Sequence, residues 1–200
     1  MVKGNPMSAP TKANLKIYQG STFSQVIRWE TGTKLYAPIT NINRSAPMVI
    51  QSPGHQIPQG WRVKVSGASG MKEVNTGDYI IVSSKDSNSL TFNEINAISY
   101  TQYTGGGVLE YHQPQDLTGY TARMQIRPSL TSNVIIKELS TENGSITVNN
   151  TAKTITLSIP AAETQLFDFK TAVYSLEMIN GSTVVPFMVG SVSLVREATR

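Results

Sequence analysis

The sequence contains no cysteine, and this absence excludes disulfide bonds, thiolate nucleophiles and cysteine metal ligands. Long apolar runs are missing as well, since no window approaches the ~20 apolar residues of a transmembrane helix. The first ten residues, MVKGNPMSAP, lack the apolar stretch of a signal peptide. We therefore expect the chain to fold in the cytoplasm of the cell that makes it and to have no membrane partner.

Charge is also scarce. Charged residues make up 15% of the 200 residues, against about 25% in an average soluble domain, and neutral polar residues fill the difference. A surface with few charges is covered by a partner at a small desolvation cost. The composition therefore favours a protein that presents broad faces to other proteins.

The excess of basic over acidic residues is not spread evenly along the chain. Lys3, Lys12 and Lys16 all precede the first acidic residue, Glu30. The segment lacks the dense Lys/Arg run and the interleaved aromatic residues of a nucleic-acid-binding tract. We interpret residues 1–11 as an extended arm that docks on a neighbouring subunit or is solvated, and we predict no specific nucleic-acid partner.

Apolar and polar residues alternate along most of the chain, with the two-residue period of half-buried strands. The pattern is clearest at residues 120–127, 154–159 and 172–179, and it also occurs at residues 23–30. Only residues 161–167, which follow a proline, are suited to a helical turn or two. The sequence therefore predicts an all-β fold.

Two Asn-Gly pairs mark predicted turns. Asn180-Gly181 separates two predicted strands and indicates a type I′ hairpin, in which both central residues have positive φ. Asn143-Gly144 is a weaker example of the same signal.

The middle of the chain has a different sequence pattern, with short predicted strands separated by glycine and proline. This pattern predicts a small β-barrel at residues 38–113, inserted into a β-sandwich formed by residues 12–37 and 114–200. We expect the flanks, residues 36–38 and 113–116, to be loops that join the two parts. The predicted strands are Met48–Gln51, 61–65, 79–83 and Ser89–Phe92, the predicted barrel interior is Trp61, Val63, Val65, Ile81 and Phe92, and the glycines predicted at turns or positive φ are Gly60, Gly67 and Gly70.

The outer segments carry a set of spaced blocks. They are QGSTF (19–23), DLTGYTARMQIR (116–127), NGSI (143–146), ITLSIP (155–160) with Thr164, AVYSLE (172–177), GSVSLVR (190–196) and the final Thr199-Arg200. In these blocks the chain resembles a family of small virion proteins of tailed phages, and it is similar to the N-terminal domain of the upper baseplate protein of lactococcal phages. The resemblance implies an immunoglobulin-like β-sandwich that anchors a module to the phage tail. One departure is Ser175, where the family pattern has an acidic residue.

The middle segment carries a second set of blocks. They are ITNI (39–42), APMVI (46–50), SPGH (52–55), GWRVKVSG (60–67), Gly70-Met71, Asn75, YIIV (79–82) and LTF (90–92). Here the chain resembles a barrel domain named after the first-catalytic-cysteine-half region of ubiquitin-activating enzymes. The resemblance implies a spacer or interaction module. It does not imply ubiquitin activation, because the catalytic cysteine and the adenylation apparatus are missing.

No motif predicts catalysis. The two histidines, His55 and His112, lack metal-ligand spacing and a motif-embedded nucleophile, and we interpret both as loop residues, with His55 capping a turn. Residues 67–70 lack the spacing of a nucleophile elbow. Gly105–Gly107 is not followed by a lysine and a helix, so we interpret it as a hinge where the insert rejoins the sandwich. Carboxylate pairs of the glycosidase kind are matched only in three dimensions, so the sequence does not exclude them. We predict no catalytic residue, no cofactor, no metal and no small-molecule substrate.

Three tyrosines, Tyr100, Tyr103 and Tyr111, lie near His112 in the sequence. They suit either a platform on which sugars or bases stack, or strand and turn residues whose exposed phenols contact another subunit. We favour the second interpretation.

Together these observations predict a non-enzymatic structural component of a tailed-phage virion, in the tail, neck or baseplate. Its expected partners are further copies of itself, as a homo-oligomer, and neighbouring virion proteins. Two alternatives remain at this point, a capsid decoration protein and a receptor- or glycan-binding module of the tail.

Overall fold

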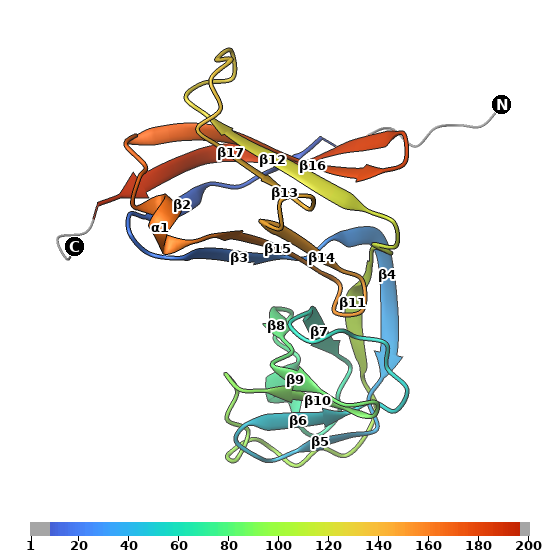
Figure 1. Cartoon of the computed structure of the whole chain (residues 1–200). Coiled ribbons are helices and arrows are strands. Elements are labelled where there is room, and N and C mark those ends of the chain that lie inside the picture. The colour runs from blue at the N-terminus through green and yellow to red at the C-terminus, as the bar shows by residue number, and fades with distance from the viewer. Residues whose placement is uncertain (1–8, 197–200) are drawn as a thin grey trace. The chain divides into compact units, whose positions relative to one another are not determined.

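The computed structural model describes residues 9–196. The predictions for Lys3 and for most of the arm, and the closing Thr199-Arg200, lie outside the described residues. The described chain is all-β, as predicted, and divides into two compact units (Figure 1). Unit 1 holds the residues up to Ile27 and those from Asp116 onward, and unit 2 is Arg28–Gln115.

Unit 1 is a β-sandwich of two sheets that lie face to face (Figure 1). The large sheet has the order β1 (Thr11–Lys12), β17 (Thr183–Val195), β16 (Thr171–Asn180), β12 (Thr121–Arg127) and β13 (Lys137–Ser140), and β2 (Leu15–Tyr18) also pairs with β17. The small sheet has the order β14 (Ile146–Asn149), β15 (Thr154–Ile159) and β3 (Phe23–Ile27).

The core of unit 1 confirms the two-residue period seen in the sequence. Successive side chains of a strand point to opposite faces, so alternate residues enter the space between the sheets. The inward residues of β12, β15 and β16 are all buried, and they are Ala122, Met124, Ile126, Ile155, Leu157, Ile159, Ala172, Tyr174, Leu176 and Met178. The predicted helical turn is also present, as α1 (Ala161–Thr164).

The N-terminal strands β1 and β2 run parallel to β17 along one edge of the large sheet. Between them the carbonyl of Ala13 accepts a hydrogen bond of 2.8 Å from the buried Tyr174 hydroxyl. A Cβ added at Gly190 would stand 1.8 Å from the same Ala13 oxygen. Thr11 therefore belongs to the sandwich, and the predicted arm is wrong at this residue because the chain already pairs with Met188.

The β16–β17 hairpin differs from its prediction. Asn180 pairs with Thr183, so the two loop residues are Gly181 and Ser182. Gly181 has φ +58° and occupies the first central position, as in a type II′ turn. The type I′ prediction, with Asn180 inside the loop, is wrong by one residue. The second pair, Asn143-Gly144, joins β13 of the large sheet to β14 of the small sheet and is not a hairpin within one sheet.

Unit 2 consists of two four-stranded sheets around one hydrophobic core. One sheet has the order β5 (Asn41–Asn43), β6 (Met48–Gln51), β10 (Ser89–Phe92) and β9 (Ser84–Lys85). The other has the order β4 (Glu30–Pro38), β11 (Val108–Pro114), β7 (Arg62–Ser66) and β8 (Tyr79–Ile81), and a 3-10 turn spans Lys72–Val74.

Two corners bridge these sheets. At the first, Ile39 N–H donates to the carbonyl of Gly107, which directly precedes β11 of one sheet, and Thr40 N–H donates to the Gln51 carbonyl in β6 of the other. At the second, Gly60 N–H donates to the Val82 carbonyl, and the next residue, Ser83, donates to Thr91. This pair of bridged sheets lies in the segment for which the sequence predicts a small barrel, and the barrel itself stays a prediction.

The predicted interior of unit 2 holds for four residues of five. Trp61, Val63, Val65 and Phe92 are buried, and the Trp61 indole N–H donates to the His112 carbonyl at 2.8 Å. The prediction is wrong for Ile81, which is 54% exposed, because Val82 fills the core in its place. Gly60, Gly67 and Gly70 have φ of +71°, +74° and +78°, as predicted.

The first junction between the units differs from the predicted one. It lies between Ile27 and Arg28, and not between residues 37 and 38. The reason is that β4 pairs along its length with β11, so residues 36–38 form a strand of unit 2 and not a loop. The second junction follows Gln115, two residues later than predicted.

The hinge predicted at Gly105–Gly107 is also wrong in position. Ser69 N–H donates to the Gly105 carbonyl, which places the three glycines inside unit 2. A Cβ at Gly107 would lie 2.9 Å from the Ala68 nitrogen, so this glycine permits a close approach of two backbone segments.

Candidate interaction surfaces

The two histidines occupy structural positions in unit 2. His55 is buried, its Nδ1 accepts from Ile57 N–H at 3.2 Å, and its Nε2 lies 3.3 Å from the Ser89 carbonyl. This geometry confirms the predicted turn cap and fixes the neutral form with the proton on Nε2. Burial lowers the pKa of His55. His112 lies in β11, so the loop interpretation is wrong for this residue, and its Nδ1 lies 3.1 Å from the Thr31 carbonyl. Residues 9–196 contain no group of three or more His, Asp or Glu side chains arranged to hold a metal.

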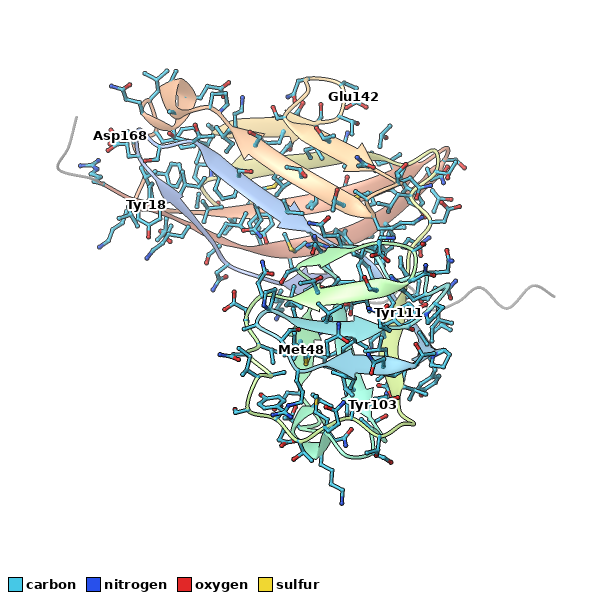
Figure 2. All side chains as sticks on the ribbon, turned by 90° about the horizontal axis from the view of Figure 1, so that it is seen from below. Tyr18, Met48, Tyr103, Tyr111, Glu142 and Asp168 are labelled. Atoms are coloured by element: carbon cyan, nitrogen blue, oxygen red, sulfur yellow. The ribbon has the colours of Figure 1, made fainter. Side chains whose placement is uncertain are left out.

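The tyrosine platform considered from sequence is wrong. Tyr103 and Tyr111, labelled in Figure 2, are 8% and 4% exposed, and burial raises the pKa of both phenols. Tyr103 donates to the carbonyls of Ile39 and Gly106, and Tyr100 packs against the core. The favoured alternative, exposed phenols at a subunit contact, is wrong for the same two residues.

Sequence reasoning missed the tyrosines that do reach the solvent in unit 2. Tyr36 is 58% exposed and Tyr79 is 37% exposed, on the two outer strands of the β4-β11-β7-β8 sheet. The register places Tyr36 opposite Glu110, Glu110 opposite Lys64, and Lys64 opposite Tyr79. We call these four residues the tyrosine row. Each is an outward residue of an alternating strand, but only the pairing of four strands brings them into line.

Ion pairs order the side chains of this face. Lys34 Nζ lies 2.7 Å from Glu110, and this hydrogen bond holds the pKa of Glu110 below its usual range. The Tyr79 hydroxyl donates to the same carboxylate at 3.4 Å. Arg62 donates to Glu30 and lies 5.0 Å from the centre of the Tyr79 ring. The face therefore presents aromatic and charged groups that already have partners.

Unit 1 has a hollow of about 460 Å³ on the outer face of β12 and β16. Arg123 and Glu177 form an ion pair of 3.0 Å within it. Arg127 donates to Gln125 Oε1 and, at 2.9 Å, to the Ser132 carbonyl of the loop that joins β12 to β13. The lining is Arg123, Gln125, Arg127, Ser129, Leu130, Val173, Tyr174, Ser175 and Glu177.

The loop beside the hollow, residues 128–136, carries exposed apolar side chains. Leu130 is 79% exposed, Val134 is 64% exposed and Ile135 is 44% exposed. The hydrogen bond of 2.8 Å from Ile136 N–H to the Ile126 carbonyl joins the two ends of the loop, and Arg127 holds its middle at Ser132. Figure 1 shows the loop projecting from the large sheet beyond β12. We call residues 128–136 the apolar loop.

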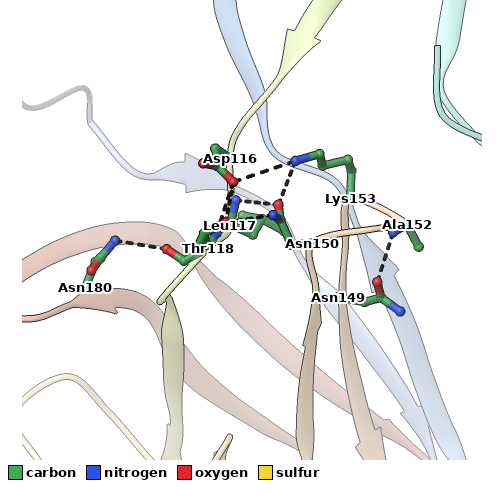
Figure 3. A network of polar contacts seen from close by, with 8 residues as sticks. All are labelled: Asp116, Leu117, Thr118, Asn149, Asn150, Ala152, Lys153 and Asn180. Carbon is green, nitrogen blue, oxygen red and sulfur yellow. Dashed lines mark hydrogen bonds and ion pairs between the residues drawn. The ribbon is translucent and has the colours of Figure 1, made fainter. Parts of the chain in front are cut away.

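The block at residues 116–119 has a structural role (Figure 3). Leu117 N–H donates to Asn150 Oδ1 at 2.8 Å, and Asn150 Nδ2 donates to the Thr118 hydroxyl. Asn180 Nδ2 donates to the Thr118 carbonyl at 3.3 Å. A hydrogen bond from Thr118 lowers the pKa of Asp116. These contacts fasten the start of the second chain segment of unit 1 to the β14–β15 and β16–β17 hairpins.

Comparison with known proteins does not assign the chain to a family. A scan against models of known protein families finds no match for the chain, and a search of curated proteins finds none. Within residues 9–196, no helix has the length and apolar character needed to cross a bilayer.

Proposed function

We propose that the chain is a non-enzymatic structural component of a tailed-phage virion, located in the tail, neck or baseplate. It acts by binding copies of itself and neighbouring virion proteins. The resemblance of the outer segments to small virion proteins supports this proposal, and so does the low charge of the sequence. Unit 1 is the part that makes the contacts.

The observation that carries the proposal is the apolar loop. Burying a large aliphatic side chain contributes about 1.5–3 kcal/mol, and Leu130 and Val134 leave most of their surface in water. Apolar side chains gathered on one exposed element mark a protein contact site. The contacts of Arg127 and Ile136 hold the loop in place before binding, which lowers the entropy cost of association.

The surroundings of the apolar loop suit a contact that excludes water. In the hollow, the Arg123 charge is paired with Glu177, and Gln125 Nε2 donates to Glu138 at 2.6 Å. A partner that covers the Arg123–Glu177 pair leaves neither of these two charges unpaired, which limits the desolvation cost. Repetition of one such contact around a symmetry axis then multiplies a modest affinity.

The experiment compares Leu130→Ser/Val134→Ser with the control Leu166→Ser. Leu166 is 81% exposed but lies outside the apolar loop, beside α1. We expect the wild-type chain and the control to assemble in sedimentation velocity runs and to appear in washed phage particles. We expect the double variant to sediment as a monomer and to be lost from particles. A wild-type chain that stays monomeric and is absent from particles contradicts the proposal.

A further inference from the structure

The tyrosine row lies on a part of the chain that the proposed assembly contact does not use. Neighbouring strands are about 4.8 Å apart, so the Cα atoms of Tyr36 and Tyr79 lie about 14 Å apart at the two ends of the row. The two rings are closer together than this, because the Tyr79 hydroxyl reaches Glu110 at 3.4 Å. Glu110 and Lys64 lie between them and supply one carboxylate and one ammonium group. Two aromatic rings with hydrogen-bonding groups between them fit a linear ligand that is apolar on its ring faces and polar at its rim.

We propose that the tyrosine row binds an uncharged, hydroxyl-rich oligosaccharide of a few sugar units. The C–H faces of the sugar rings stack on Tyr36 and Tyr79. The sugar hydroxyls donate to Glu110 and accept from Lys64. The site does not depend on the assembly role proposed above.

The groups that meet the ligand are ordered in advance. Glu110 is held by Lys34 at 2.7 Å and by the Tyr79 hydroxyl at 3.4 Å. The Arg62 guanidinium covers part of the Tyr79 ring and is itself fixed by Glu30. The pKa of Glu110 lies below its usual range, so the carboxylate is ionised and accepts hydrogen bonds at neutral pH. A shallow site gains affinity from such order, because little side-chain freedom is lost on binding.

Two other ligand classes fit this face less well. The centres of protein interfaces are depleted in Lys and Glu, whereas this face has Glu110 and Lys64 at its centre and Lys34 beside them. Nucleic acid brings a dense line of phosphates, whereas on this face Lys34 and Arg62 are already paired with Glu110 and Glu30. A sugar carries no charge to desolvate and satisfies both kinds of group through its hydroxyls.

The test applies the full chain to an array of neutral and acidic oligosaccharides, followed by calorimetric titration with the neutral sugar that retains it best. We expect Tyr36→Ala and Tyr79→Ala each to weaken binding about ten-fold, as expected for the loss of one aromatic stacking contact. Tyr36→Phe, which keeps the ring, retains most of the affinity. The control is Tyr18→Ala, which removes a tyrosine of unit 1 that is 42% exposed. Unchanged tryptophan fluorescence shows that the variants are folded.

Several outcomes overturn the proposal. One is a wild-type chain that no saccharide retains, and another is binding that survives the Tyr36→Ala/Tyr79→Ala double substitution. A third is retention of acidic saccharides alone, with an affinity that falls as salt is added. This result would mean that binding is due to the lysine charges and not to stacking on the tyrosine rings. Sedimentation of the same samples tests the assembly proposal separately from the saccharide proposal, because the tyrosine variants are expected to assemble as the wild type does.

Discussion

Units 1 and 2 differ in the length of their strands and in where their exposed apolar side chains lie. Unit 1 uses long strands whose alternate residues are buried, and its most exposed apolar side chains lie on connections such as the apolar loop. Apart from β4 and β11, unit 2 uses short strands, and its chain passes from one sheet to the other at corners. Of its exposed apolar and aromatic side chains, Tyr36, Tyr79 and Ile81 stand on a sheet face, and Ile98 lies on a connection. The difference teaches that strand length decides how much of a fold can be inferred from a periodic pattern.

The comparison also implies that each unit has its own stability. The hydrophobic core of unit 2 is formed by residues of unit 2, and both tryptophans of the chain, Trp29 and Trp61, belong to that unit. Tryptophan fluorescence therefore reports on unit 2. Hydrogen exchange in β16 and β17 reports on unit 1. The following changes test this independence, from the largest expected effect to the smallest.

Trp61→Ala is the strongest perturbation of unit 2. Trp61 is fully buried, and its indole donates to the His112 carbonyl at 2.8 Å. Truncating a buried tryptophan costs about 3–5 kcal/mol of unfolding free energy. We expect urea unfolding of unit 2, followed by the fluorescence of Trp29, to shift to much lower denaturant. Amide exchange in β16 and β17 is expected to stay as in the wild type, and a matching loss of protection there would show that the two units share one cooperative transition.

Gly190→Ala is the corresponding perturbation of unit 1. The added Cβ would stand 1.8 Å from the Ala13 carbonyl oxygen, so β1 or β17 must shift. Overpacking of this kind costs about 1–3 kcal/mol. We expect faster amide exchange in β16 and β17 with an unchanged fluorescence midpoint. Gly32→Ala serves as the control, because nothing lies within 4 Å of its added Cβ, and this variant is expected to behave as the wild type.

The smallest effect is a pH dependence confined to unit 2. Burial lowers the pKa of His55 in the folded chain, so below its unfolded value of about 6.5 the unfolded chain binds more protons. We expect the stability of unit 2 to be fully present above that pH and to decrease as the pH falls toward the folded-state pKa. His55→Asn, whose side-chain oxygen can accept from Ile57 N–H in place of Nδ1, is expected to remove this component while His112 stays in place. Equal pH dependence of the two proteins would assign the effect to other groups.

The outward and inward residues of unit 1 could be predicted because the pattern runs through whole strands. In β12, β15 and β16, three or more alternating apolar residues leave only one register that buries them all. The turn at Gly181 was misplaced by one residue, since the Asn-Gly signal marks a turn without fixing which pair of residues forms it.

Unit 2 was less predictable for a definite reason. Residues 79–82 are four consecutive apolar residues, and such a run does not say which of Ile81 and Val82 faces the core. The pairing of β7 with β8, which sets Val63 opposite Ile80, decides that Ile81 points outward. Strand pairing also decides the direction of two tyrosines. Tyr111 points inward with Leu109, and Tyr36 points outward opposite Glu110.

The sequence by itself determined the all-β class, the faces of the long strands, and the turn capped by His55, because each of these depends on contacts between residues near one another in the chain. Only the tertiary structure decided that residues 30–38 belong to unit 2, that Tyr103 is buried, and that Tyr36 and Tyr79 end one row across four strands. These features depend on pairing between segments far apart in the chain, and the alternation within each strand is the same whichever neighbour it meets.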